Sequence, residues 1–275
     1  MLLKSIIDSI ESVAPRSAQE SWDNSGMQVG DTGRDIQSVL LTTDVTTDVV
    51  DEAIMLGCQL IISHHPLLFH GLKQVCGQTP QARIVEKAIK HDIAIYSAHT
   101  SLDSVQGGIN TRLADLLGLA NVTPLRPSVS LPAASFLGVI GSLPEPMPFD
   151  SFLKHVRACL NTTYIRYTLP QFSILHSPFS ILNSQFSIQR VALCGGSGAE
   201  FIPEAIAQGA DVYLTADVKY HEFQEADGRI AIVDIDHWVS EKHARDIFRD
   251  LLAPLAPQGL TCYISEKDHT PIHIY

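Results

Sequence analysis

Two adjacent histidines, His64 and His65, follow a short apolar run, residues 59–63, within the sequence SHHP. The run predicts a buried strand, and the imidazoles at the end of a strand that bends can both face one pair of ions. Pro66 stiffens that bend. The alternative is that both histidines are polar residues of an ordinary loop. We therefore treat His64 and His65 as candidate metal ligands.

A carboxylate follows the next predicted strand, residues 93–98, because Asp103 ends the motif HTSLD. An aspartate at this place could bind or bridge metal ions, or it could cap the turn that follows. His99 opens the same motif. It could be a ligand, or it could orient a ligand through its ring nitrogen.

His237 and Glu241 are four residues apart on a helix that we expect over residues 236–252. This spacing places both side chains on one helix face, as in helical zinc motifs. It is also the spacing of a common surface ion pair. The pair opens its helix directly after a buried apolar strand, residues 229–235, which favours the metal-site interpretation.

The five candidates together suit a dinuclear centre better than a single ion. A catalytic zinc usually takes three protein ligands and keeps one open position. Two divalent ions that share a bridging carboxylate would use all five and could polarise a phosphoryl or carbonyl oxygen. No cysteine stands near any candidate, which argues against a thiolate site and leaves Zn, Fe, Mn, Co and Ni undistinguished. The candidate ligands are His64, His65, Asp103, His237 and Glu241.

The elements that must position these residues alternate between strands and helices, which predicts an α/β fold with mixed sheets flanked by helices. In such sheets ligands gather at the carboxyl edge of the strands, where SHHP and HTSLD both lie. The proline-rich residues 120–134 break the pattern and predict a crossover. We therefore expect two α/β domains, 1–125 and 126–275, with the metal site between them.

One segment, residues 171–189, reads QFSILHS, PFSILNS, QFSIQ, which is a repeat of seven residues. It is too short for a solenoid and lacks the pattern of a coiled coil. We interpret it as a tandem duplication that lengthens a hairpin or loop.

Composition narrows the function classes. The 275 residues carry 19 basic and 30 acidic side chains, a formal net charge of -11, which disfavours a general nucleic-acid surface. No apolar run approaches the roughly 18 residues that cross a bilayer, and no signal peptide is recognisable, so we expect no membrane partner. Five scattered cysteines without a CxxC motif indicate reduced thiols and a cytoplasmic protein.

Each of two further motifs allows two interpretations. The GGSG motif, residues 195–198, could cradle a phosphate with its backbone N–H groups, or it could form a tight turn that needs positive φ. The SWDNSG motif, residues 21–26, could form a lid over the site, and its Trp22 could instead belong to the core.

A set of motifs in this order closely resembles a known family, the dinuclear-metal-centre proteins called GTP cyclohydrolase I type 2 homologues (the Nif3-like family). The likeness covers nearly the whole chain except the heptad segment. It is carried by SWDNSGMQVGD (21–31), LLTTDVT (40–46), LIISHHPLLF (60–69), HTSLD (99–103) with GGINTRLADLLGL (107–119), CGGSG (194–198), LTADVKYHEF (214–223) and DIDHWVSEKHA (234–244).

The resemblance implies a two-domain α/β fold and a toroidal homohexamer of the short form, without a central inserted domain. It also implies two divalent ions between the domains, held by the residues matching the five candidates above. Asp236 departs from the family, which usually has Gly before the histidine. The added negative charge would either tighten cation binding or repel an anionic substrate.

Three function classes follow. The first is a metal-dependent hydrolase acting on a nucleotide or related substrate, and the family name points to opening of the GTP ring with loss of formate. The second is a non-catalytic metal-binding protein or a ring-shaped scaffold. The third, a nucleic-acid module, is disfavoured by the net charge of -11.

Overall fold

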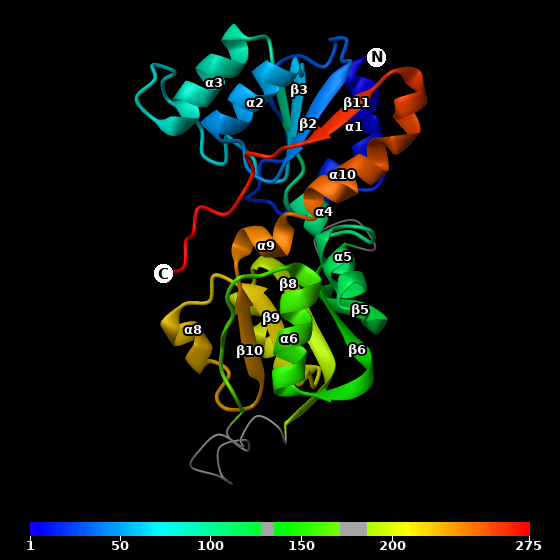
Figure 1. Ribbon diagram of the computed structural model, residues 1–275, viewed down its shortest axis with the longest axis vertical. Helices are drawn as coiled ribbons and strands as arrows, with labels where there is room; N and C mark the ends of the chain where they lie inside the picture. Colours follow the sequence, from blue (N-terminus) through cyan, green and yellow to red (C-terminus); the bar gives the residue numbers. More distant parts are fainter. Residues whose placement is uncertain (128–134, 171–185) are drawn as a thin grey trace. The chain divides into compact units, whose positions relative to one another are not determined.

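The computed structural model describes residues 1–127, 135–170 and 186–275 (Figure 1). These residues form two compact units. Unit 1 comprises Met1–Gly108 and Lys242–His269, and unit 2 comprises Ile109–Glu241 and Thr270–Tyr275. This division differs from the expected boundary at residue 125. The chain enters unit 2 earlier, and it later returns to unit 1 because its last strand pairs with a strand near the N-terminus.

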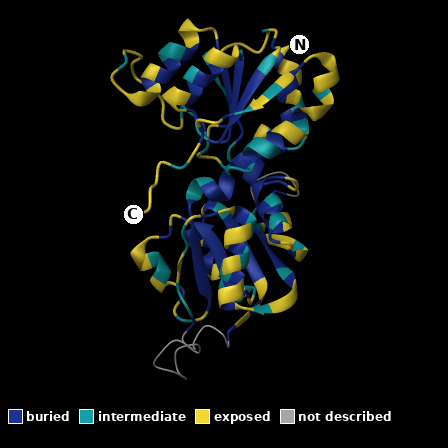
Figure 2. Cartoon of the chain, viewed as in Figure 1, coloured by how far each residue is buried: buried dark blue, intermediate teal, exposed yellow. Residues whose placement is uncertain are grey.

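Unit 1 is built on a mixed five-stranded sheet with the order β1-β4-β3-β2-β11. All neighbouring strands are parallel except β1 and β4, which are antiparallel. The strands are β1 (Gly26–Val29), β2 (Ser38–Thr42), β3 (Leu60–Ser63), β4 (Ala94–Ser97) and β11 (Thr261–Ile264). Strands β2, β3 and β4 are buried almost throughout, as expected for parallel strands covered on both faces (Figure 2).

Helices cover this sheet, and local signals set their ends. Thr46 caps α2 by accepting a hydrogen bond from the Val49 N–H, and Gly57 ends that helix in the left-handed region with φ of 66°. Side chains of α2 and α3 pack on the sheet residues Leu40 and Ile61. The helices of unit 1 are α1 (Leu3–Glu11), α2 (Thr47–Leu56), α3 (Pro80–Lys90), α4 (Thr100–Asp103) and α10 (Ala244–Leu252), with 3-10 turns η1 (Arg16–Ala18) and η5 (Ala253–Gln258).

Unit 2 contains a mixed six-stranded sheet with the order β5-β6-β8-β9-β10-β7. Its strands are β5 (Ala120–Pro127), β6 (Phe136–Pro148), β7 (Arg166–Tyr167), β8 (Ser187–Ser197), β9 (Val212–Ala216) and β10 (Ala231–Ile235). Its helices are α5 (Ile109–Leu116), α6 (Phe149–Leu160), α7 (Ile202–Ala207), α8 (Tyr220–Gln224) and α9 (His237–Glu241), with the 3-10 turn η4 (Ala199–Phe201). Strands β8, β9 and β10 run parallel, so they end at one edge. The expectation of α/β architecture with mixed sheets is confirmed.

The crossover expected over residues 120–134 is wrong for its first part. Ala120–Pro127 form β5, which pairs antiparallel with β6. Two of the prolines that suggested irregular structure, Pro124 and Pro127, lie in β5, which is the edge strand of its sheet, and edge strands tolerate proline.

The single helix expected over residues 236–252 is also wrong, because the chain forms α9 and α10 with a break at Lys242 and His243. At the break the Arg245 N–H donates to the Lys242 carbonyl at 3.4 Å, three residues back, whereas an α-helical N–H donates to the carbonyl four residues back. The break coincides with the passage of the chain from unit 2 to unit 1.

Two other expectations meet the structure only in part. The heptad segment lies outside the described residues over positions 171–185, and its last residues begin β8. Among the residues that the structure describes, no helix has the length and apolar character needed to span a bilayer.

Candidate metal centre

Neighbouring parallel strands bring the histidines of unit 1 together. Ser63 of β3 pairs with Ser97 of β4, so the chain leaves both strands at the same edge. His64 follows β3 directly and is fully buried, and its ring centroid lies 5.0 Å from that of His65. The ring of His99, which follows β4, lies 5.3 Å from that of His64 and 5.4 Å from that of His65.

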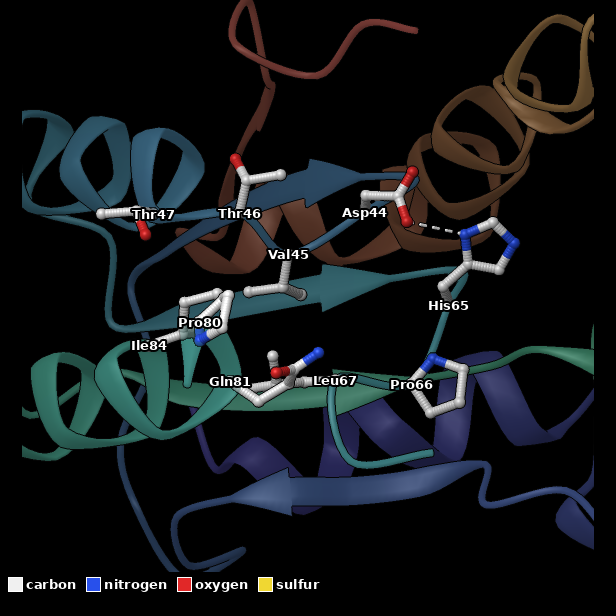
Figure 3. Close-up of a pocket in the computed structure, with 10 residues that line it drawn as sticks. All are labelled: Asp44, Val45, Thr46, Thr47, His65, Pro66, Leu67, Pro80, Gln81 and Ile84. Carbon is white, nitrogen blue, oxygen red and sulfur yellow. Dashed lines mark hydrogen bonds and ion pairs between the residues drawn. The ribbon is translucent and has the colours of Figure 1, made fainter. Parts of the chain in front are cut away.

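The Nδ1 atom of each of these rings is held by an acceptor. His64 Nδ1 donates to the Ala98 carbonyl at 2.9 Å. His65 Nδ1 donates to Asp44 at 2.8 Å, as the dashed line in Figure 3 marks, and His99 Nδ1 donates to Asp23 at 2.8 Å. When such a ring is in its neutral form, its single proton lies on Nδ1 and the lone pair of Nε2 is presented. This is the arrangement in which histidines bind metals in proteins.

Ligand atoms of His64, His65 and His99 all lie within 4.8 Å of one another, close enough to hold an ion. Oδ1 of Asp103, on the short helix α4, lies 3.6 Å from Nε2 of His64. The structure thus brings together the candidates that the sequence places in unit 1 and adds His99 to them. Imidazole nitrogens with a carboxylate oxygen suit a borderline divalent cation.

The other two candidates, His237 and Glu241, lie one turn apart on α9 in unit 2. Nε2 of His237 and Oε2 of Glu241 are 2.9 Å apart. Nδ1 of His237 donates to Oδ2 of Asp217 at 2.7 Å, which repeats the pattern of unit 1. Asp217 follows β9 with a left-handed φ of 57°, a conformation that aspartate tolerates better than most residues and that brings its carboxylate to the ring.

These carboxylates change the acidity of the His237 ring. Burial alone would lower its pKa, but the charge of Glu241 and the hydrogen bonds with Asp217 and Glu241 outweigh burial and raise the pKa of His237 to about 11. The hydrogen bond from His237 in turn lowers the pKa of Asp217. A cation would compete with the proton of this ring, which fits a site built for positive charge.

Glycine leaves room for Glu241. Gly196 lies in the irregular end of β8 with φ of 63°, and a Cβ atom there would overlap Oε1 of Glu241. The Gly196 N–H donates to Ser240 Oγ, and the Gly195 N–H donates to Asn110, both at 2.9 Å. Most of the GGSG motif is therefore the irregular end of strand β8, with the positive φ expected for a turn found at Gly196. The N–H groups of Gly195 and Gly196 are used within the protein and are not available to a phosphate.

Asp236 acts as the cap of α9. Its Oδ1 accepts a hydrogen bond from the Val239 N–H at 3.1 Å, and its Oδ2 accepts one from Thr270 Oγ1 at 2.8 Å. The carboxylate is buried, with 2 % of the residue exposed. Local helix capping thus accounts for the residue that departs from the family pattern.

Three residues that hold the rings of candidate ligands escaped the sequence-based reasoning: Asp23, Asp44 and Asp217. Each orients one histidine. Asp217 comes one residue after β9, and Asp44 comes two residues after β2. Ligands gather where parallel strands end, which is the rule that indicated His64, and the same rule would have indicated these two aspartates. No such signal marks Asp23, whose partner His99 is 76 residues away.

A cavity of about 340 Å³ borders His65. Asp44 and His65 line one side of it, and the first residues of α2 and α3 line the other (Figure 3). Pro66 and Leu67 add apolar walls. The candidate ligand His65 therefore borders a hollow large enough for part of a small molecule.

The model of the Duf34/NIF3 (NGG1p interacting factor 3) family matches residues 1–271. A Streptococcus pneumoniae protein called GTP cyclohydrolase 1 type 2 homolog is 33% identical over 260 residues, covering 94% of this chain and 91% of that protein. A Clostridium perfringens protein of the same name is 34% identical, covering 88% and 87%. NIF3-like protein 1 of Drosophila melanogaster is 28% identical, covering 98% and 88%.

Solved structures show the same architecture. A Bacillus cereus protein described as related to NIF3 superposes with a TM-score of 0.87 at 25% identity, covering 100% of this chain and 99% of that one. Reduced HcgD from Methanocaldococcus jannaschii superposes with a TM-score of 0.76 at 25% identity, covering 97% and 98%. The fold described above is thus shared across distant organisms.

Proposed function

The chain belongs to the Duf34/NIF3 (NGG1p interacting factor 3) family, and on this premise we propose that it is a metal-dependent hydrolase. The proposed site joins the two groups of candidates from unit 1 and unit 2. It holds two divalent cations, whose identity among Zn, Fe, Mn, Co and Ni the ligand set leaves open. The ligands are His64, His65, Asp103, His237 and Glu241.

One observation carries the proposal. All three proposed histidine ligands have Nδ1 bound to an oxygen acceptor, namely the Ala98 carbonyl, Asp44 and Asp217. A histidine of ordinary structural role needs no such common orientation, whereas a metal-binding histidine requires the proton on one nitrogen and the lone pair on the other. The same pattern at three histidines from two separate segments of the chain supports a shared cation site.

When bound, divalent cations supply Lewis acidity and activate water for attack. The protein contributes the orientation of the ligands. Asp44 and Asp217 hold the rings of His65 and His237 in one tautomer, and the buried position of His64 limits the access of bulk water. Asp103, whose Oδ1 lies 3.6 Å from Nε2 of His64, would supply a carboxylate ligand beside that histidine.

The proposed substrate is a nucleotide, and the proposed reaction is opening of the guanine ring of GTP with loss of formate. This choice rests on the name shared by the relatives from S. pneumoniae and C. perfringens. A homohexameric ring is part of the proposal because the motif resemblance implies it. A cytoplasmic location is part of it because the sequence has five cysteines and all are free in the structure.

The test measures the amount of bound metal and the rate of the reaction in separate experiments. Protein purified without added metal is analysed for bound elements, then loaded and assayed for formate released from GTP. We expect two equivalents of metal per chain and formate release that Glu241→Ala abolishes. Glu86→Ala, which removes a glutamate from a surface pair with Lys90, is the matched control and should keep full activity.

The non-catalytic alternative makes a different prediction. If the protein stores or delivers metal, or acts as a ring-shaped scaffold, Glu241→Ala should weaken metal binding while wild type and variant release formate equally slowly. Equal formate release by wild type and Glu241→Ala would therefore contradict the hydrolase proposal and leave the metal-binding role.

A further inference from the structure

Two large aromatic side chains of unit 1 stand exposed side by side. Trp22 is 58% exposed and Phe69 is 42% exposed. Their ring centroids are 5.9 Å apart and their planes are inclined by 59°, so they form an open corner. The exposure of Trp22 excludes the interpretation that it belongs to the core.

The exposure of this pair is not the result of a loose backbone. Asp23, next to Trp22, is anchored at the interior by hydrogen bonds that its carboxylate accepts from the Thr100 N–H at 3.1 Å and from Thr100 Oγ1 at 2.6 Å. The Asn24 side chain donates to the Leu68 carbonyl at 2.8 Å. The backbone beside Trp22 and the backbone beside Phe69 are therefore both held by hydrogen bonds, while the two rings are exposed.

The corner adjoins the histidines of unit 1. The ring of His99 lies 6.1 Å from that of Trp22 and 6.2 Å from that of Phe69, in edge-on orientation to both. His99 in turn shares the cluster of His64 and His65. A molecule that touches the aromatic corner is thus within reach of the candidate metal centre.

The size of the corner decides which kind of occupant it fits. A large aromatic side chain can bury about 150–250 Å². A stable protein interface needs about 800 Å² from each partner, which two rings do not supply. Two inclined rings instead match a small planar ring, which can stack on the face of one and meet the edge of the other.

We propose that Trp22 and Phe69 form the subsite for a planar heteroaromatic ring, which stacks on Trp22. This inference rests on the proposed function and deepens it, because it assigns the ring of the substrate to a place beside the metal centre. The short loop that contains Trp22 and Asp23 has two roles in this arrangement. Asp23 orients the ring of His99, and Trp22 supplies the stacking surface. The substrate class is a nucleoside or another molecule with an aromatic heterocycle.

The test uses the tryptophan itself as the reporter. The sequence has only two tryptophans, Trp22 and Trp238, so Trp238→Phe leaves Trp22 as the single indole. Metal-free Trp238→Phe protein is titrated with guanosine and, separately, with ribose 5-phosphate, which has no aromatic ring. We expect guanosine to quench the fluorescence and ribose 5-phosphate to leave it unchanged.

Guanosine affinities of Trp22 variants then distinguish the loss of stacking from a loss of folded structure. Guanosine binding to the metal-free protein, measured by equilibrium dialysis, should weaken about 5- to 150-fold in Trp22→Leu and by less than about threefold in Trp22→Phe. Met55→Ala, which removes another exposed side chain, should leave binding unchanged. Zinc affinity of Trp22→Leu should equal that of wild type, which confirms the fold and keeps this test separate from the metal proposal.

Three results would overturn the inference. One is the absence of quenching by guanosine, and another is equal guanosine affinity in wild type and Trp22→Leu. The third is a change of oligomeric state in Trp22→Leu, seen by sedimentation velocity, with unchanged guanosine affinity, since the corner would then belong to an interface between copies. Failure of metal binding with intact quenching would contradict only the proposed function.

Discussion

The carboxylate of Glu241 lies where a side chain on residue 196 would begin, so the two fit together only because residue 196 is a glycine. A Cβ atom on residue 196 would overlap Oε1 of Glu241, and the φ of 63° at this position is one that side chains rarely adopt. The strand end that carries Gly196 therefore determines where the carboxylate of Glu241 lies. Steric fit, and not only charge, positions this candidate ligand.

Gly196→Ala should therefore displace Glu241. We expect a loss of about 1–2 kcal/mol from the left-handed backbone and about 1–3 kcal/mol more from overpacking. Gly209→Ala is the matched control, because Gly209 has a φ of 71° with no atom within 4 Å of the added Cβ, and it should show only the backbone cost. Urea unfolding measures both, and equal losses in the two variants would contradict the steric relationship.

Asp44 and Asp217 should matter for metal affinity although neither is a proposed ligand. Asn at either position keeps the size of the side chain but weakens its hold on the ring of His65 or His237. We expect zinc affinity, measured by calorimetry, to fall about 10- to 100-fold with the fold intact by circular dichroism. Asp51→Asn, which breaks an ion pair with Lys87 on α2 and α3, should bind zinc like wild type. An unchanged affinity in Asp44→Asn and Asp217→Asn would count against the orienting role.

Asp23 should make stability depend on pH in the acid range. Burial alone would raise its pKa, but the hydrogen bond and charge of His99 and the hydrogen bond from Thr100 hold it well below its usual value. A folded pKa below the unfolded one stabilises the protein above the unfolded pKa of about 4, and this stabilisation is lost as the pH falls through the folded pKa.

Asp23→Asn should therefore cost about 2–4 kcal/mol at pH 7 and progressively less below about pH 4. Urea unfolding at pH 7 and pH 3 measures the difference. Asp35→Asn is the control, since the Asp35 side chain is 84% exposed, and it should have little effect at either pH. A cost for Asp23→Asn that stays constant with pH would show that the charge of Asp23 is not what stabilises the fold.

The cap of α9 gives a prediction about Asp236. Asp236→Ala should lower the free energy of unfolding by about 1 kcal/mol, because the Val239 N–H loses its acceptor. Asp236→Asn keeps an oxygen for that N–H and should cost clearly less. Thermal unfolding of the metal-free variants measures the order. Equal stability of Asp236→Ala and wild type would contradict the capping role.

Much of the architecture could be predicted because its signals are local. The apolar runs before SHHP and HTSLD indicate buried strands, Thr46 and Gly57 mark the ends of α2, and the spacing of His237 and Glu241 places them on one helix face. Each of these signals depends on residues a few positions apart, where backbone geometry alone decides the outcome. The alternation of strands and helices likewise indicates the α/β class.

Other features depend on contacts between distant parts of the chain. That β11 returns to pair with β2 follows from sheet order, which no local pattern encodes. The same holds for Asp23, whose hydrogen bond to His99 spans 76 positions, and for Gly196, which makes room for a carboxylate 45 positions away. The sequence by itself determined which side chains could bind a cation, because that depends on their chemistry. Only the tertiary structure decided how each ring is turned and what holds it, because those relationships arise when strands far apart in sequence come to lie side by side.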